Sequence, residues 1–110
     1  MTITWADFEK IEIRVGTIIA VEQFPKARNP SFKLSIDFGE EIGIKKSSAQ
    51  ITALYSPDAL IGTQIAAVIN FPPKQIANFM SECLVLGAVQ GKEVTLITLD
   101  KPSKNGLRIS

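Results

Sequence analysis

The stretch FKLSIDF, residues 32–38, alternates apolar and polar side chains at every position. Such alternation directs the apolar side chains to one side of an extended chain and predicts a half-buried β-strand. Residues 39–41, Gly-Glu-Glu, predict a turn, and a second strand is expected to follow with Ile42 and Ile44 directed inward. The pair predicts a β-hairpin. Its exposed face is expected to carry Lys33, Ser35, Lys45 and Ser47.

The residues before this hairpin predict a short helix and a long strand. Thr4 and Asp7 have the spacing of a capping box, so we expect a helix over residues 5–10. Alternation then runs over residues 11–21, and Gly16 within it indicates a bulge or a bend. The inward face of this strand is expected to carry Ile11, Ile13, Val15, Ile19 and Val21.

The residues after the hairpin predict further short strands. A helical piece is expected over residues 50–55, and a buried strand over residues 64–71 that Pro72 and Pro73 terminate. Two more strands are expected within residues 79–89 and 93–99. Short strands joined by turns indicate one all-β domain over residues 1–110, a sandwich or a small barrel. The alternative α+β class is weaker, because no segment shows sustained helical periodicity.

The composition argues against an enzyme. The 110 residues include no histidine, the usual general base and metal ligand, and no nucleotide-binding or nucleophile motif. Asp37, Glu40 and Glu41 are expected to form a solvated turn, so neither a metal nor a cofactor is expected. No apolar run approaches the length of a membrane span and the N-terminus does not resemble a secretory signal. A lone cysteine, Cys83, fits a reducing, cytoplasmic location.

The net charge of the chain is only +1, but several lysines and small polar residues lie in segments without acidic residues. Lysines without acidic neighbours are able to contact phosphates, and serine or asparagine side chains bind phosphate oxygens and base edges. The ordinary alternatives are solvated lysines and turn-forming polar residues, and both remain open. The candidate nucleic-acid-binding residues are Lys33, Lys45, Lys46, Ser47, Ser48, Asn70, Lys74 and Ser81.

An apolar binding surface is expected after the two prolines. Phe79 and Met80 lie in a segment flanked by polar residues, which favours exposure, and both side chains suit contact with an unfolded polypeptide. Phe71 is expected to belong to the core, since it continues the alternation of the strand before it.

Four stretches of the chain, in order, resemble the tRNA-binding OB-fold family, which occurs in certain aminoacyl-tRNA synthetases and as small free-standing proteins. They are IEIRVG at residues 11–16, KLSIDFG at residues 33–39, LIG at residues 60–62 followed by VINFPPK at residues 68–74, and MSECL at residues 80–84. The resemblance implies a Greek-key OB barrel with short helices and N- and C-terminal extensions. It also implies a capacity to bind tRNA.

Residues 38–52 resemble one branch of that family, a small bacterial chaperone of protein export. The likeness implies a homodimer that binds unfolded preproteins, associates with the export motor and retains tRNA binding. The alternative is a free-standing tRNA-binding protein that acts with aminoacyl-tRNA synthetases. A hydrophobic content of 45% and the apolar residues Leu107 and Ile109 in the tail independently favour a dimer, because association hides apolar surface.

Overall fold

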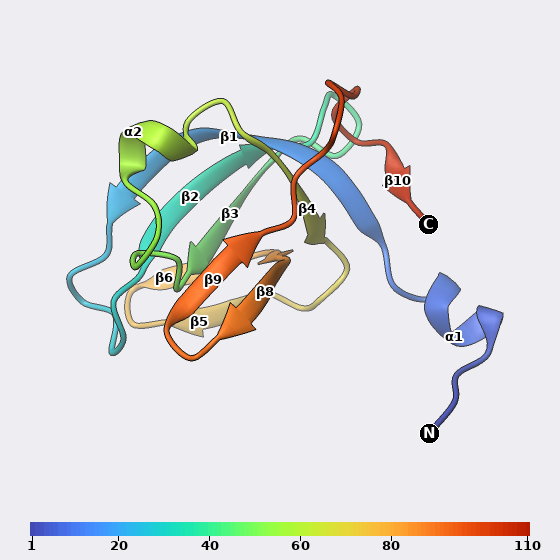
Figure 1. Ribbon diagram of the computed structural model, residues 1–110, viewed down its shortest axis with the longest axis horizontal. Helices are drawn as coiled ribbons and strands as arrows, with labels where there is room; N and C mark the ends of the chain where they lie inside the picture. Colours follow the sequence, from blue (N-terminus) through green and yellow to red (C-terminus); the bar gives the residue numbers. More distant parts are fainter.

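The protein folds around an antiparallel sheet that curls into a nearly closed barrel (Figure 1). The computed structural model describes residues 1–110. The strand order is β3-β2-β1-β4-β7, and β10 pairs with the first residues of β1. These strands are β1 (Ile13–Gln23), β2 (Phe32–Asp37), β3 (Ile44–Ala49), β4 (Gln64–Val68), β7 (Leu84–Val85) and β10 (Arg108–Ile109). The all-β OB-type fold expected from the sequence is confirmed.

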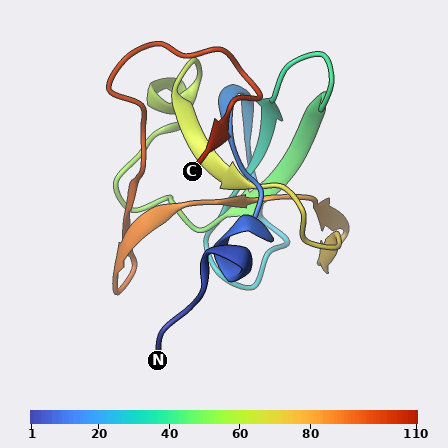
Figure 2. The same cartoon turned by 90° about the vertical axis from the view of Figure 1, so that its right-hand side faces the viewer.

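Two hairpins and two short helices complete the fold. The hairpin of β5 (Lys74–Ile76) and β6 (Phe79–Ser81) forms a sheet of its own, as does that of β8 (Gly87–Gln90) and β9 (Glu93–Leu96). Figure 2 shows the β5–β6 hairpin projecting from the side of the barrel. The helices are α1 (Trp5–Glu9) and α2 (Pro57–Leu60). Neither is long and apolar enough to cross a membrane.

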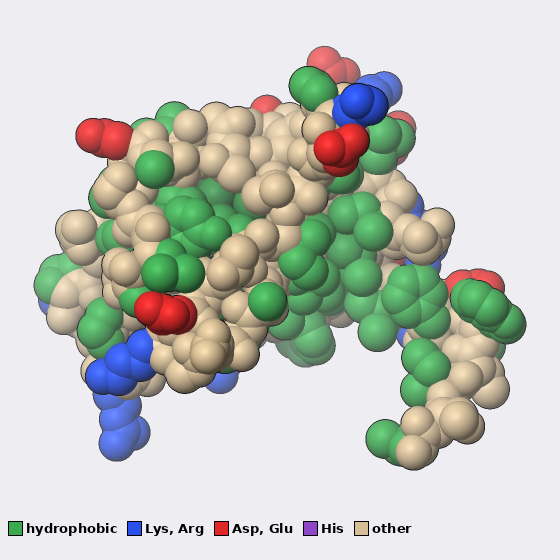
Figure 3. Space-filling view, viewed as in Figure 1, with side chains coloured by type: hydrophobic (Ala, Val, Ile, Leu, Met, Phe, Trp, Pro, Cys, Tyr) green, Lys and Arg blue, Asp and Glu red, His purple; other side chains and the backbone are tan.

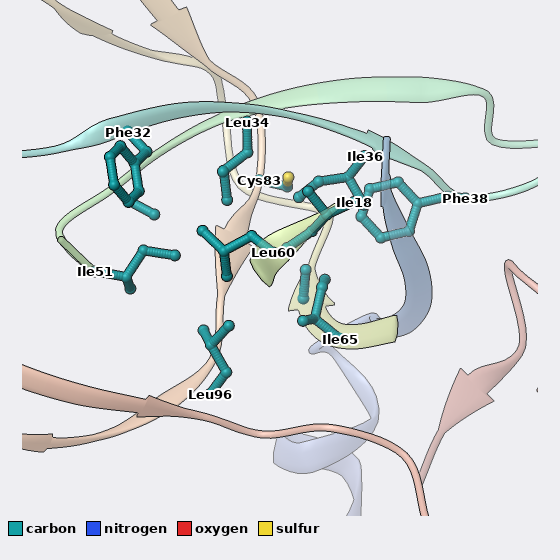
Figure 4. Packing of buried hydrophobic residues seen from close by; sticks show 12 residues of the cluster. Ile18, Phe32, Leu34, Ile36, Phe38, Ile51, Leu60, Ile65, Cys83 and Leu96 are labelled. Atoms are coloured by element: carbon teal, nitrogen blue, oxygen red, sulfur yellow. The ribbon is translucent and has the colours of Figure 1, made fainter. Parts of the chain in front are cut away.

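The core fills the barrel with side chains from strands that are distant in sequence (Figure 4). Ile18, Leu34 and Ile65 lie within it and are almost completely buried. Gly16 lets β1 approach β2 closely, because a Cβ at this position would lie 2.6 Å from Ile36 Cγ2 and 2.7 Å from the Phe38 ring. The glycine in β1 therefore serves close packing.

A register shift in β1 corrects the inward set expected from alternation. The pairing of β1 with β2 shifts between Ile18 and Ala20, which is the mark of a bulge. Ile18 is consequently buried in the core, whereas Ile19, expected to point inward, is exposed. The expectation for Ile19 was wrong because Ile19 is the extra residue of the bulge, whereas Val21 beyond the bulge lies opposite Leu34 and packs against the core as expected.

The orientation of β3 is also opposite to the expected one. Gly43 adopts φ +85°, a left-handed conformation that interrupts alternation between Ile42 and the strand. Ile44 is 60% exposed, and Ser47, expected outside, is buried. In the register, Lys33 lies opposite Ser48, and Ser47 lies opposite Leu34. The outward face of the β2–β3 hairpin therefore carries Lys33, Ser35, Lys46 and Ser48.

Residues 52–54 form a turn, and no helix is present over residues 50–55, where a helical piece was expected. The helix α2 begins only at Pro57, where the fixed φ of proline suits a first helical position, and the Ser56 hydroxyl accepts a hydrogen bond from Ala59 N at 3.4 Å. In α1, by contrast, the capping box of Thr4 and Asp7 is present as expected. That helix stands away from the barrel, buries no residue and leaves Trp5 83% exposed.

The outer edge of β3 is covered by Ser81, the last residue of β6, and by Glu82, which follows it. Glu82 N donates to Lys46 O at 2.7 Å, and Lys46 N donates to Glu82 Oε1 at 2.9 Å. Ser48 N donates to the Ser81 hydroxyl at 3.0 Å. Side-chain oxygens of Ser81 and Glu82 thus occupy the places that strand carbonyls fill in a regular ladder.

Candidate functional site

A groove of about 400 Å³ lies between the barrel and the β5–β6 hairpin. Ser48 lines it from β3, Lys74 from β5 and Ser81 from β6. Phe71 and Leu84 contribute apolar walls. The groove therefore combines one cation, one carboxylate (Glu82), hydroxyl groups and apolar surface, a combination that suits an extended polymer with both charged and apolar parts.

Local pairing brings three of the candidate polar residues together. Lys74 lies opposite Ser81 in the hairpin register, and the Ser81 hydroxyl accepts the hydrogen bond from Ser48 N. The side chain of Lys46 is exposed on the same outward face of β3 as Ser48. Lys45 points to the opposite face of β3, where it lies opposite Ile36.

Two other candidates do not line the groove and have structural hydrogen bonds instead. The buried Ser47 hydroxyl donates to Cys83 O at 2.9 Å. Asn70 joins the N-terminal segment to the barrel, because its Oδ1 accepts from Glu12 N at 3.0 Å and its Nδ2 donates to Lys10 O at 2.7 Å. Contact of either side chain with a ligand would require rearrangement of these bonds.

Lys33 is held between aromatic rings. Its Nζ lies 5.5 Å from the ring centroid of Phe24 and 5.8 Å from that of Phe79. The same Nζ lies 3.6 Å from a carboxylate oxygen of Glu22, its partner across the β1–β2 ladder. Only 29% of the Lys33 side chain is exposed.

The aromatic residues of this region differ from expectation in one case. Phe71 is 55% exposed in the groove and does not belong to the core as expected, because β4 ends at Val68 and the chain turns outward before Pro72. Met80 is exposed, as its polar neighbours indicated. Phe79 is half-buried, since its ring packs edge-to-face on Phe24 at a centroid distance of 5.4 Å.

Cys83 lies at the base of the groove with no cysteine to pair with. Burial raises the pKa of its thiol to about 11, although a hydrogen bond with Ser47 and the positive charge of Lys45 act in the opposite direction. The thiol is therefore protonated and a weak nucleophile at neutral pH.

A family model matches the part of the chain that forms the barrel. Residues 13–108 match the family model described as "Putative tRNA binding domain". The chain belongs to the tRNA-binding domain family. The resemblance expected from the sequence is confirmed.

Solved structures extend the likeness to complete chains. This tRNA-binding domain superposes on the crystal structure of chaperone CsaA from Bacillus anthracis str. Ames with a TM-score of 0.95 and 48% identity, covering 100% of both chains. The CsaA chaperone protein from Picrophilus torridus gives a TM-score of 0.94 and 55% identity over 99% of this chain and 100% of that one. The expected likeness to this chaperone branch of the family is thereby confirmed at the level of fold and sequence.

Curated relatives with similar sequences include tRNA ligases. The methionine–tRNA ligase of Thermococcus kodakarensis is 31% identical over 107 residues, and that of Methanoregula boonei is 34% identical over 103 residues. These alignments cover 97% and 94% of this tRNA-binding domain but only 14% and 15% of the ligases. The chain thus corresponds to about one seventh of each ligase.

A second hollow of about 710 Å³ lies between the β2–β3 turn and the C-terminal tail of the tRNA-binding domain. Its lining contains charges of both signs, from Arg14 and Lys104 and from Glu40 and Glu41. Arg14 donates from Nη1 to Gly106 O at 3.1 Å, and a hydrogen bond from its Nη2 is the main cause of the lowered pKa of the Glu12 carboxyl. These pairings give the hollow a structural role, so the candidate site remains the groove.

Proposed function

We propose that this protein is a CsaA-like chaperone that binds unfolded preproteins, and also tRNA, in the groove beside the β5–β6 hairpin. The observation that carries the proposal is the mixed lining of the groove, where Lys74 and two hydroxyl groups face the apolar side chains of Phe71 and Leu84. Stacking and apolar contact would hold bases or client side chains, and lysines would attract phosphates. Full-length likeness to two CsaA chaperones supports the choice.

Binding by this groove requires no chemistry. The proposal accordingly includes no catalytic step and no cofactor, and client release would depend on affinity alone. A cytoplasmic location follows from the same proposal, since nascent preproteins and tRNA meet there. Association with the export motor is the most specific part of the proposed role and concerns the fate of the bound client.

A homodimer is part of the proposal. Apolar side chains gather on the face between the barrel and α1 (Figure 3). Trp5, Ile11 and Leu107 are among the large exposed apolar residues. Association of two copies would remove such surface from water, and α1, which has no buried residue in the single chain, would gain a surface to pack on.

The second candidate is a free-standing tRNA-binding protein that acts with aminoacyl-tRNA synthetases. The likeness to a segment of methionine–tRNA ligases favours it. The two functions differ in what the apolar residues do, because a dedicated tRNA binder depends mainly on phosphate contacts.

Competition between ligands separates the two. An unfolded preprotein and tRNA are offered to the purified protein, and suppression of preprotein aggregation without ATP is measured beside tRNA binding. We expect Phe71→Ser with Met80→Ser to weaken aggregation suppression more than tRNA binding, and Lys46→Ala with Lys74→Ala to do the reverse. Tight tRNA binding by a protein that fails to slow aggregation at several-fold excess would favour the second candidate.

A further inference from the structure

One wall of the groove is an appendage of the barrel. The β5–β6 arm, defined as residues 74–81, supplies Lys74, Ile76 and Ser81 to the groove lining. Its two strands pair only with each other and form no ladder with the six-stranded sheet. It leaves the barrel directly after Pro72 and Pro73. Apart from the Glu82 N to Lys46 O hydrogen bond directly after the arm, the position of this wall therefore depends on contacts that involve side chains.

Those contacts lie at the two ends of the arm. At the junction with the barrel, the Ser81 hydroxyl accepts a hydrogen bond from Ser48 N. Beside the turn of the arm, where Ile76 pairs with Phe79, the Phe79 ring packs on the buried ring of Phe24. The ammonium group of Lys33 lies over both rings, so it interacts with the anchor of the arm and with the barrel at once.

We propose that Lys33 is a positioning residue, which fixes the β5–β6 arm against the barrel and thereby shapes the groove without contacting ligand phosphates. The proposal rests on the function proposed above. The Lys33 ammonium already has two ring faces and the Glu22 carboxylate as partners. A cation over aromatic faces is attracted by their quadrupoles, and a phosphate would have to displace these partners. Lys46 and Lys74 have exposed side chains and form no ion pair.

Salt dependence distinguishes a positioning lysine from a lysine that contacts phosphate. A phosphate contact releases counterions, so its loss lowers the slope of log affinity against log salt by about 0.7 for single-stranded RNA. Loss of a positioning residue weakens binding by the same factor at every salt concentration and leaves the slope unchanged. Lys33→Met removes the charge and keeps an apolar side chain, and Lys46→Met is the matched control.

The test measures tRNA affinity by fluorescence anisotropy over a salt series. We expect Lys33→Met to weaken binding about two- to fivefold at each salt concentration, which is the factor that an exposed cation–π contact provides. The slope should stay at the wild-type value, while Lys46→Met should lower it by about 0.7. Lys33→Arg, which keeps a cation over the rings, should restore affinity. A lowered slope in Lys33→Met, or unchanged affinity, would overturn the proposal.

Hydrogen exchange supplies a readout that needs no ligand. In Lys33→Met the backbone amides of residues 74–81 should exchange faster than in the wild type, and those of β1 and β2 should not. Phe79→Leu should produce the same local pattern, since it removes the ring that Lys33 contacts. Unchanged exchange in the arm would refute the positioning role. If the wild type binds no tRNA, the proposed tRNA binding fails, and the exchange measurement still decides the role of Lys33.

Discussion

Replacing Lys46 and Lys74 together with alanine should flatten the salt dependence of tRNA binding by a calculable amount. Both side chains are exposed, and neither forms an ion pair. Each phosphate that a lysine neutralises contributes about 0.7 to the slope of log affinity against log salt, so the pair contributes about 1.4. Over a fourfold rise in salt, from about 50 to about 200 mM, this share corresponds to about a sevenfold loss of affinity.

The assay is a titration of labelled tRNA at several salt concentrations. The wild type should lose about seven times more affinity across the series than the double variant. Lys92→Ala is the matched control, because Lys92 lies in the turn between β8 and β9 and outside the groove. An equal slope in the wild type and the double variant, or a control that flattens the slope as strongly, would show that phosphates bind elsewhere.

Three further predictions concern stability and assembly. Gly16→Ala should lower the free energy of unfolding by about 1–3 kcal/mol in urea titrations, because its methyl group would collide with Ile36 and Phe38. Raising the pH from roughly 9 to 11 should cost the wild type up to roughly 2–3 kcal/mol more than Cys83→Ala, since the unfolded thiol ionises before the folded one. Trp5, the single tryptophan, should emit at shorter wavelength in concentrated than in dilute protein; emission independent of concentration, with a monomer in sedimentation, would contradict the dimer.

The sequence predicted best those elements in which a short local pattern is compatible with only one backbone conformation. In residues 32–38 the burial alternates as the sequence does, because an extended chain in a half-buried sheet allows nothing else. Thr4 and Asp7 likewise identified the start of α1, since both partners of a capping box lie within one turn. The expected strand faces were wrong at Ile19, which is the extra residue of a bulge, and at Ser47, which follows the left-handed Gly43. Neither event is visible in the pattern of apolar residues.

The candidate site shows a similar division. Lys74 and Ser81 were singled out because Lys74 has no acidic neighbour in sequence and Ser81 is a small polar residue near the end of an expected strand. The environment of Lys33 could not be predicted from the sequence, because Phe24 and Phe79 are brought to its ammonium group only by the tertiary fold. Phe71 was assigned to the core because alternation continues past Val68, although the strand itself ends there. Its position before two prolines was the available signal for an outward turn.

The contacts of Glu82 and Ser81 with β3 have a consequence for how the protein behaves among unfolded chains. A terminal strand with free N–H and C=O groups is a template on which another polypeptide can pair, and repeated pairing of that kind produces aggregates. Here the donors of Lys46 and Ser48 are already occupied by a carboxylate and a hydroxyl group. If the protein holds unfolded polypeptides as proposed, these contacts would keep this edge of its own sheet from seeding their aggregation.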